Sequence, residues 1–94
     1  MRIKDHELQA IKECIRSRDP DVRIYLFGSR VSDREKGGDI DLLLLSKRLN
    51  YDDKIKIRQT LYETIGEQKI DIVIAEDTSD PFVKMAMEQG VLIE

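Results

Sequence analysis

A run of four leucines, Leu42–Leu45, constrains the fold of this chain more than any other stretch. Successive side chains of a strand point to opposite sides, so an unbroken apolar run is typical of a strand that is covered on both faces. Two aspartates, Asp39 and Asp41, stand one residue apart where this strand begins. Their spacing puts both carboxylates on one face, about 7 Å apart, and Ile40 on the other. The sequence therefore predicts a central strand with a pair of acids at its start.

Periodicity predicts the other elements. Apolar spacings of three and four residues favour helices over residues 4–18 and 52–65, and Asp80 followed by Pro81 is a typical start for a third helix, which Gly90 would end. We expect Ile57, Leu61, Ile65 and Tyr62 to dock the second helix. We expect Phe82, Met85 and Ala86 to dock the third, with Val83 as a further candidate. Runs of β-branched, aromatic and other apolar residues favour strands over 22–27, 39–45 and 70–75, and residues 91–93 form an edge strand or a tail. The order α-β-β-α-β-α predicts an α/β (α+β) fold, a small mixed sheet with helices mainly on one face.

Length and charge narrow the classes of protein. We expect residues 1–94 to form one domain, with no room for a separate substrate-binding domain. The net charge of −3 argues against a basic nucleic-acid coat, so direct nucleic-acid binding is not expected. With Cys14 as the one cysteine, neither an internal disulfide nor a cysteine-based zinc site can form. The N-terminus is charged and no apolar run approaches the ~20 residues of a membrane span, so we expect a cytoplasmic protein with no membrane contact.

Two aspartates one residue apart are a weak signal by themselves. Asp19 and Asp21 have the same spacing around Pro20, and that segment is typical of a turn. Asp39 and Asp41 could likewise be solvated at the end of their strand. Asp71 strengthens a functional interpretation, because it is the single charge near the start of an otherwise apolar strand.

If the strand of Asp71 neighbours that of Asp41, three carboxylates can share one face, which is the minimum protein contribution to a two-metal site for phosphoryl or nucleotidyl transfer. The alternative for Asp71 is a salt bridge to Lys54, Lys56 or Lys69. Gly28 and Ser29 follow the first strand, where a glycine allows close backbone approach and the N–H and hydroxyl groups can cradle phosphate. Alone, the same pair is an ordinary turn.

These segments together resemble the minimal nucleotidyltransferases of the DNA polymerase β superfamily. The resemblance covers nearly the whole chain and lies in Phe27-Gly28-Ser29-Arg30, Gly38-Asp39-Ile40-Asp41-Leu42 and Lys69-Ile70-Asp71-Ile72-Val73. It implies that Asp39 and Asp41 bind two Mg²⁺ ions, and that Asp71 binds one of them and orients or deprotonates the acceptor hydroxyl. It also implies that Gly28, Ser29 and Arg30 hold the triphosphate of ATP or another NTP. The loop between Ser29 and Asp39 is one residue shorter than is usual in the family. We expect activity to survive this difference, and triphosphate binding is the step that the shorter loop would affect.

The resemblance extends to MNT-type antitoxins, which neutralise helical HEPN-type toxin proteins. The first hypothesis is therefore an enzyme that transfers an NMP, with AMP the expected case, to a hydroxyl of such a partner. The second is a binding module with the same fold that neutralises its partner by contact. A third is transfer to a small molecule such as an aminoglycoside, which the lack of a second domain disfavours. The acceptor and the oligomeric state stay open.

Overall fold

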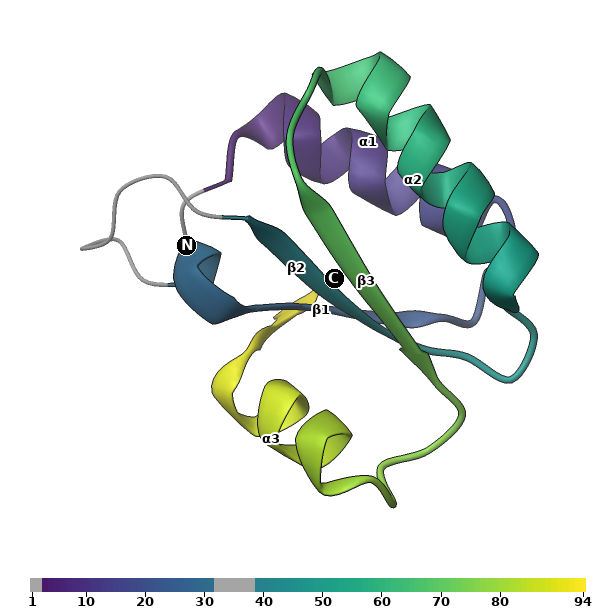
Figure 1. Cartoon of the computed structure of the whole chain (residues 1–94), viewed down its shortest axis with the longest axis vertical. Coiled ribbons are helices and arrows are strands. Elements are labelled where there is room, and N and C mark those ends of the chain that lie inside the picture. Colours follow the sequence, from purple (N-terminus) through teal and green to yellow (C-terminus); the bar gives the residue numbers. More distant parts are fainter. Residues whose placement is uncertain (1–2, 32–38) are drawn as a thin grey trace.

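The computed structural model describes residues 3–31 and 39–94, with only the backbone described at Ser29 and Arg30. A four-stranded sheet has helices on both faces (Figure 1). The elements are α1 (Asp5–Arg16), β1 (Arg23–Phe27), the short 3-10 helix η1 (Gly28–Val31), β2 (Ile40–Leu45), α2 (Tyr51–Ile65), β3 (Ile70–Ala75), α3 (Pro81–Gln89) and β4 (Val91–Ile93). The mixed α+β class and the element order are as predicted, and residues 91–93 form a strand. The predicted loop over residues 32–38 lies outside the described residues.

The sheet has the order β3-β2-β1-β4. β1 pairs with β2 and with β4 in antiparallel fashion, whereas β2 and β3 are parallel and are joined through α2. β2 is therefore an interior strand, and Leu42, Leu43 and Leu44 are all fully buried. The prediction of a strand covered on both faces is confirmed.

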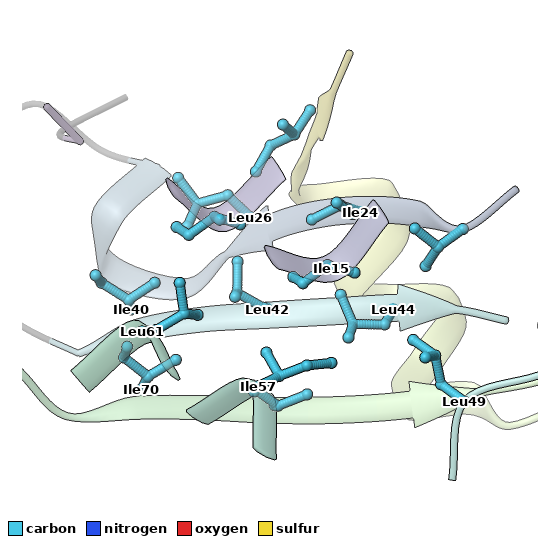
Figure 2. Close-up of a cluster of buried hydrophobic side chains, with 14 residues drawn as sticks. Ile15, Ile24, Leu26, Ile40, Leu42, Leu44, Leu49, Ile57, Leu61 and Ile70 are labelled. Atoms are coloured by element: carbon cyan, nitrogen blue, oxygen red, sulfur yellow. The ribbon is translucent and has the colours of Figure 1, made fainter. Parts of the chain in front are cut away.

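The main core lies between the sheet and the pair α1 and α2 (Figure 2). Ile11 and Ile15 of α1 and Ile57 and Leu61 of α2 are fully buried. They meet the sheet residues Ile24, Leu26, Ile40, Leu42, Leu44, Ile70 and Ile72. A smaller cluster on the opposite face joins Leu43 of β2 to Val83 and Ala86 of α3. No helix within the described ranges is long and apolar enough to cross a bilayer.

Three residues that were expected to dock helices are more exposed than predicted. Phe82 is 47% exposed, Met85 39% and Tyr62 47%. In α3 the buried positions are Val83 and Ala86. Phe82 and Met85, each one residue earlier, therefore lie at the edge of the buried face of the helix. Phe82 still makes an edge-to-face contact with Phe27, with ring centroids 5.9 Å apart.

The segment Asp19-Pro20-Asp21 is a structural turn, as predicted. Asp19 is buried, accepts a 2.6 Å hydrogen bond from the hydroxyl of Ser46 and accepts another from the backbone N–H of Asp21. The Ser46 hydroxyl oxygen in turn accepts from the backbone N–H groups of Arg48 and Leu49. This network fixes the chain at the end of β2 that lies away from Asp41.

Gly90 gives a first test of the packing. A Cβ at this position would lie 2.6 Å from the carbonyl oxygen of Ala86 and 2.7 Å from that of Leu26, both in the backbone. We expect Gly90→Ala to lower the free energy of unfolding by about 1–3 kcal/mol, because α3 and β1 must separate. Urea unfolding measures the change, with the exposed Gln89→Ala as the control. Equal stability of the two variants would contradict this close approach.

Candidate functional site

Asp41 and Asp71 face each other across neighbouring parallel strands. The register pairs Asp41 of β2 with Asp71 of β3, so the two side chains lie on the same face of the sheet, which is the face that carries α3. Asp39 comes immediately before β2, two residues ahead of Asp41. The neighbouring strands on which the predicted cluster depended are therefore present.

Asp41 is influenced electrostatically by both of the other acids. The pKa of Asp41 is raised above its ordinary value, first because burial removes the carboxylate from water and then because of the negative charges of Asp71 and Asp39. A hydrogen bond with Asp71 raises this pKa further, while the charge of Lys69 lowers it. The cluster consequently favours a bound proton or another cation.

Lys69 forms an ion pair with Asp39 in this cluster. Its ammonium nitrogen lies 3.5 Å from Oδ2 of Asp39, with the two side chains 70% and 41% exposed. Lys69 was one of three lysines considered as salt-bridge partners of Asp71, whereas in the structure Lys69 pairs with Asp39. An exposed pair of this kind contributes about 0–1 kcal/mol, so a divalent cation could displace it at little cost.

Gly28 lies directly against the carboxyl group of Asp41. Its φ of +77° is in the left-handed region, and a Cβ there would clash with Oδ2 of Asp41 and lie 3.1 Å from Cγ. The turn after β1 and the acids of β2 therefore form one unit. The side chains of Ser29 and Arg30, which were predicted to hold the triphosphate, lie outside the described residues.

Two aromatic residues, Phe27 and Phe82, lie near Asp41 on the β1 side. Phe27 is the register partner of Asp41 and shares its face of the sheet, and the ring of Phe82 from α3 packs on it edge to face. Both rings therefore lie on the face of the sheet that carries Asp41 and Asp71.

The donor chemistry fits a hard divalent cation. Carboxylate oxygens are the ligands that Mg²⁺ prefers, and repulsion among the three acids is relieved by positive charge. In the part of the chain that the structure describes, however, no group of three or more His, Cys, Asp or Glu side chains is placed so that it could hold a metal ion. The roles of Asp39, Asp41 and Asp71 as metal ligands and catalytic residues, and of Gly28, Ser29 and Arg30 in nucleotide binding, stay predictions.

A hollow of about 370 Å³ adjoins Asp71 at the start of β3. It is lined by Arg58, Tyr62, Gln68, Lys69, Ile70 and Asp71. Analysis of the sequence missed Arg58, Tyr62 and Gln68 as site residues. A signal was present, because Tyr51, Ile55 and Tyr62 recur at helical spacing outside the apolar stripe of their helix. A larger hollow, of about 580 Å³, lies at the opposite end of the sheet around Ser46 and contains no predicted site residue.

Residues 9–94 match the family described as polymerase beta, nucleotidyltransferase. A Haemophilus influenzae protein described as the probable protein adenylyltransferase MntA is 27% identical over 94 residues, which cover 98% of this chain and 82% of that protein.

Two solved structures have a similar fold. One is a mutant of the toxin–antitoxin complex MntA–HpeT, with a TM-score of 0.75 and 21% identity over 93% of this chain and 72% of that chain. The other is the tri-AMPylated Shewanella oneidensis HEPN toxin in complex with its MNT antitoxin, with a TM-score of 0.70 and 23% identity over 94% of this chain and 69% of that chain. The resemblance that the sequence indicated is confirmed. The chain belongs to the polymerase beta nucleotidyltransferase family and is a nucleotidyltransferase.

Proposed function

We propose that this protein transfers AMP from ATP, with Mg²⁺, to a hydroxyl group of a HEPN-type toxin that it neutralises in the cytoplasm. The observation that carries the proposal is the pairing of Asp41 with Asp71 across β2 and β3, with the Gly28 turn against Asp41. The adenylyltransferase relative and the AMPylated toxin in a complex of similar fold support the choice of AMP and of a protein acceptor.

Each acid has a role that its place in the fold suits. Asp39 and Asp41 would hold the divalent ions. Asp71, on the neighbouring strand, would accept the proton of the acceptor hydroxyl. The hydroxyl oxygen of the acceptor would then form a bond to the α-phosphorus of ATP as the bond to pyrophosphate breaks and pyrophosphate leaves. Gly28 would let the backbone approach the triphosphate closely. Bound Mg²⁺ supplies positive charge that neutralises the phosphates and lowers the pKa of the attacking hydroxyl.

Label transfer tests the chemistry. The protein is mixed with labelled ATP, Mg²⁺ and a HEPN-type protein from the same organism. We expect Asp39→Asn and Asp41→Asn each to reduce transfer by about 10²-fold or more, because each removes a charged ligand. Asp21→Asn is the matched control, since Asp21 is exposed, belongs to a pair with the same spacing and should leave the rate unchanged.

The same experiment decides between the two principal hypotheses. If the wild-type protein binds the HEPN-type protein but transfers no label, and Asp39→Asn/Asp41→Asn binds it equally well, neutralisation is by contact and the enzymatic proposal is wrong. Transfer that survives in Asp41→Asn at the rate of Asp21→Asn would also contradict the assigned roles.

The raised pKa of Asp41 predicts a stability effect with a defined sign. Because the pKa in the folded state exceeds the unfolded value, the ionised carboxylate destabilises the fold at neutral pH, and this cost is absent below the ordinary value of about 3.8. In EDTA at pH 7 we expect Asp41→Asn to raise the melting temperature by about 2–5 °C, a gain that vanishes as the pH falls toward that value. Thermal unfolding monitored by circular dichroism measures both effects.

Magnesium should reverse the order of the melting temperatures of the wild-type protein and Asp41→Asn. Saturating Mg²⁺ should raise the melting temperature of the wild-type protein and of Asp21→Asn, and should have little effect on Asp41→Asn. If Asp41→Asn melts at a lower temperature than the wild-type protein in EDTA, the carboxylate stabilises the fold. That result would contradict the interpretation that the acids lower stability and are present for a functional reason.

A further inference from the structure

The helix α3 packs on the sheet beside the acids, on the face opposite α1 and α2 (Figure 1). Its buried residues Val83 and Ala86 form a cluster with Leu43 of β2. Asp41 lies two residues earlier in the same strand, which places it on the same face and about 7 Å nearer the end of the sheet. Leu43 is fully buried, whereas Asp41 and Asp71 are half-buried. A molecule bound at the two acids would therefore lie against the flank of α3.

Phe82 is the residue of α3 that reaches the level of the acids. Its ring packs edge to face on Phe27, with the centroids 5.9 Å apart, and Phe27 is the register partner of Asp41. Partner side chains of neighbouring strands lie about 5 Å apart, so the Phe82 ring is roughly 10 Å from Asp41. That separation is comparable with the distance between the phosphates and the base of an extended nucleotide. Phe82 is nevertheless 47% exposed, so much of its surface is open to a ligand.

The position of Phe82 is fixed by its neighbours as well as by Phe27. Asp80, the N-cap of α3, accepts a 2.7 Å hydrogen bond from the backbone N–H of Phe82, and Pro81 between them restricts the backbone at the first turn. Met85 stands three residues later on the same side of the helix and is 39% exposed. A fixed aromatic ring with a flexible thioether beside it forms an apolar surface next to a polar site, which is the usual composition of a small-molecule site.

We propose that Phe82 stacks on the base of the nucleotide whose phosphates are held by Gly28 and the acids, with Met85 at the edge of the same surface. The inference rests on the proposed function, since it names the residue that binds the base of ATP at the same site. Aromatic side chains stack on every base, because each base has a π face. The larger ring system of a purine gains more contact, so this surface favours purine over pyrimidine nucleotides and does not by itself separate ATP from GTP.

Fluorescence tests the contact directly. The chain contains no tryptophan, so Phe82→Trp introduces a single indole at the proposed stacking surface. With Mg²⁺ and without acceptor, we expect ATP to quench the emission of this variant saturably. Tripolyphosphate, which has no base, should leave the emission unchanged while it competes with ATP.

Leu92→Trp is the matched control for fluorescence. Leu92 is 43% exposed and is the register partner of Tyr25, so it lies on the same face of the sheet but on β4, with β1 between it and the strand of Asp41. ATP should not quench the emission of Leu92→Trp. Absence of quenching in Phe82→Trp, or equal quenching in both variants, would overturn the proposal.

Affinity separates the base from the phosphates. Phe82→Leu keeps an apolar contact with Phe27 and removes the aromatic ring. By isothermal titration calorimetry we expect this variant to bind ATP about 10-fold more weakly than wild type and to bind tripolyphosphate within about 2-fold of wild type. Phe82→Tyr, which restores the ring, and Leu92→Ala should both bind ATP as the wild type does. Unchanged ATP affinity in Phe82→Leu, or an equal loss for tripolyphosphate, would contradict a contact with the base.

Comparison of nucleotides tests the preference for purines. Wild-type protein should bind ATP and GTP with similar affinity and CTP more weakly, and Phe82→Leu should narrow the difference between ATP and CTP. Equal affinity of the wild-type protein for ATP and CTP would show that no stacking preference exists.

The outcomes distinguish this inference from the function on which it rests. If the wild-type protein transfers no AMP and Phe82→Leu still weakens ATP binding selectively, the proposed function fails and the base contact stands. If the wild-type protein transfers AMP and Phe82→Leu keeps the wild-type KM for ATP, the function stands and the base contact is wrong. If the wild-type protein binds no ATP, both are wrong.

Discussion

The parallel register between β2 and β3 is the constraint on which the rest of the structure depends. It sets Asp41 opposite Asp71 on one face and, by the same alternation, Ile40 opposite Ile70 on the other. A slip of one residue in β3 would turn Asp71 into the core beneath α1 and α2 and bring Ile70 and Ile72, now 3% and 2% exposed, to the α3 face. Burial of an unpaired carboxylate and exposure of two isoleucines both oppose that slip. The hydrophobic core therefore positions the acids.

The two faces of the sheet divide stability and chemistry between them. The face under α1 and α2 contains the larger set of buried side chains, whereas α3 covers the other face through Val83 and Ala86. Asp41 and Asp71 lie at the end of this second face, where burial and then like charges raise the pKa of Asp41 and where Gly28 adopts a positive φ. Sites of this kind cost stability, and here the cost is offset by packing on the opposite side of the same strands.

Much of this arrangement follows from the sequence, and the rest fails to follow for physical reasons. Side-chain alternation was sufficient to assign Asp41 to a face of its strand and to identify β2 as a covered strand, because both depend on local periodicity. The pairing of Asp71 with Asp41 could be stated only as a condition, since strand order is determined by tertiary packing. The contact of Lys69 with Asp39 could not be predicted, because a salt bridge between two exposed side chains depends on their rotamers and not on apolar periodicity. The exposure of Tyr62 and Phe82 was missed, because helical spacing alone does not separate an apolar residue of the buried face from one at its rim.

The two edge strands of the sheet are protected in different ways. Natural proteins protect edge strands by keeping them short or by covering them, because a long open edge invites another chain. β4 has three residues, whereas β3 has six and its outward groups meet α2 at the Arg58–Ile70 hydrogen bond. The longer edge is therefore the covered one, since Ile70 and Ile72 are 3% and 2% exposed whereas Val91 and Leu92 of β4 are 37% and 43% exposed. Short length protects one edge and α2 protects the other, so the strand that positions Asp71 is held in register by the protein's own packing.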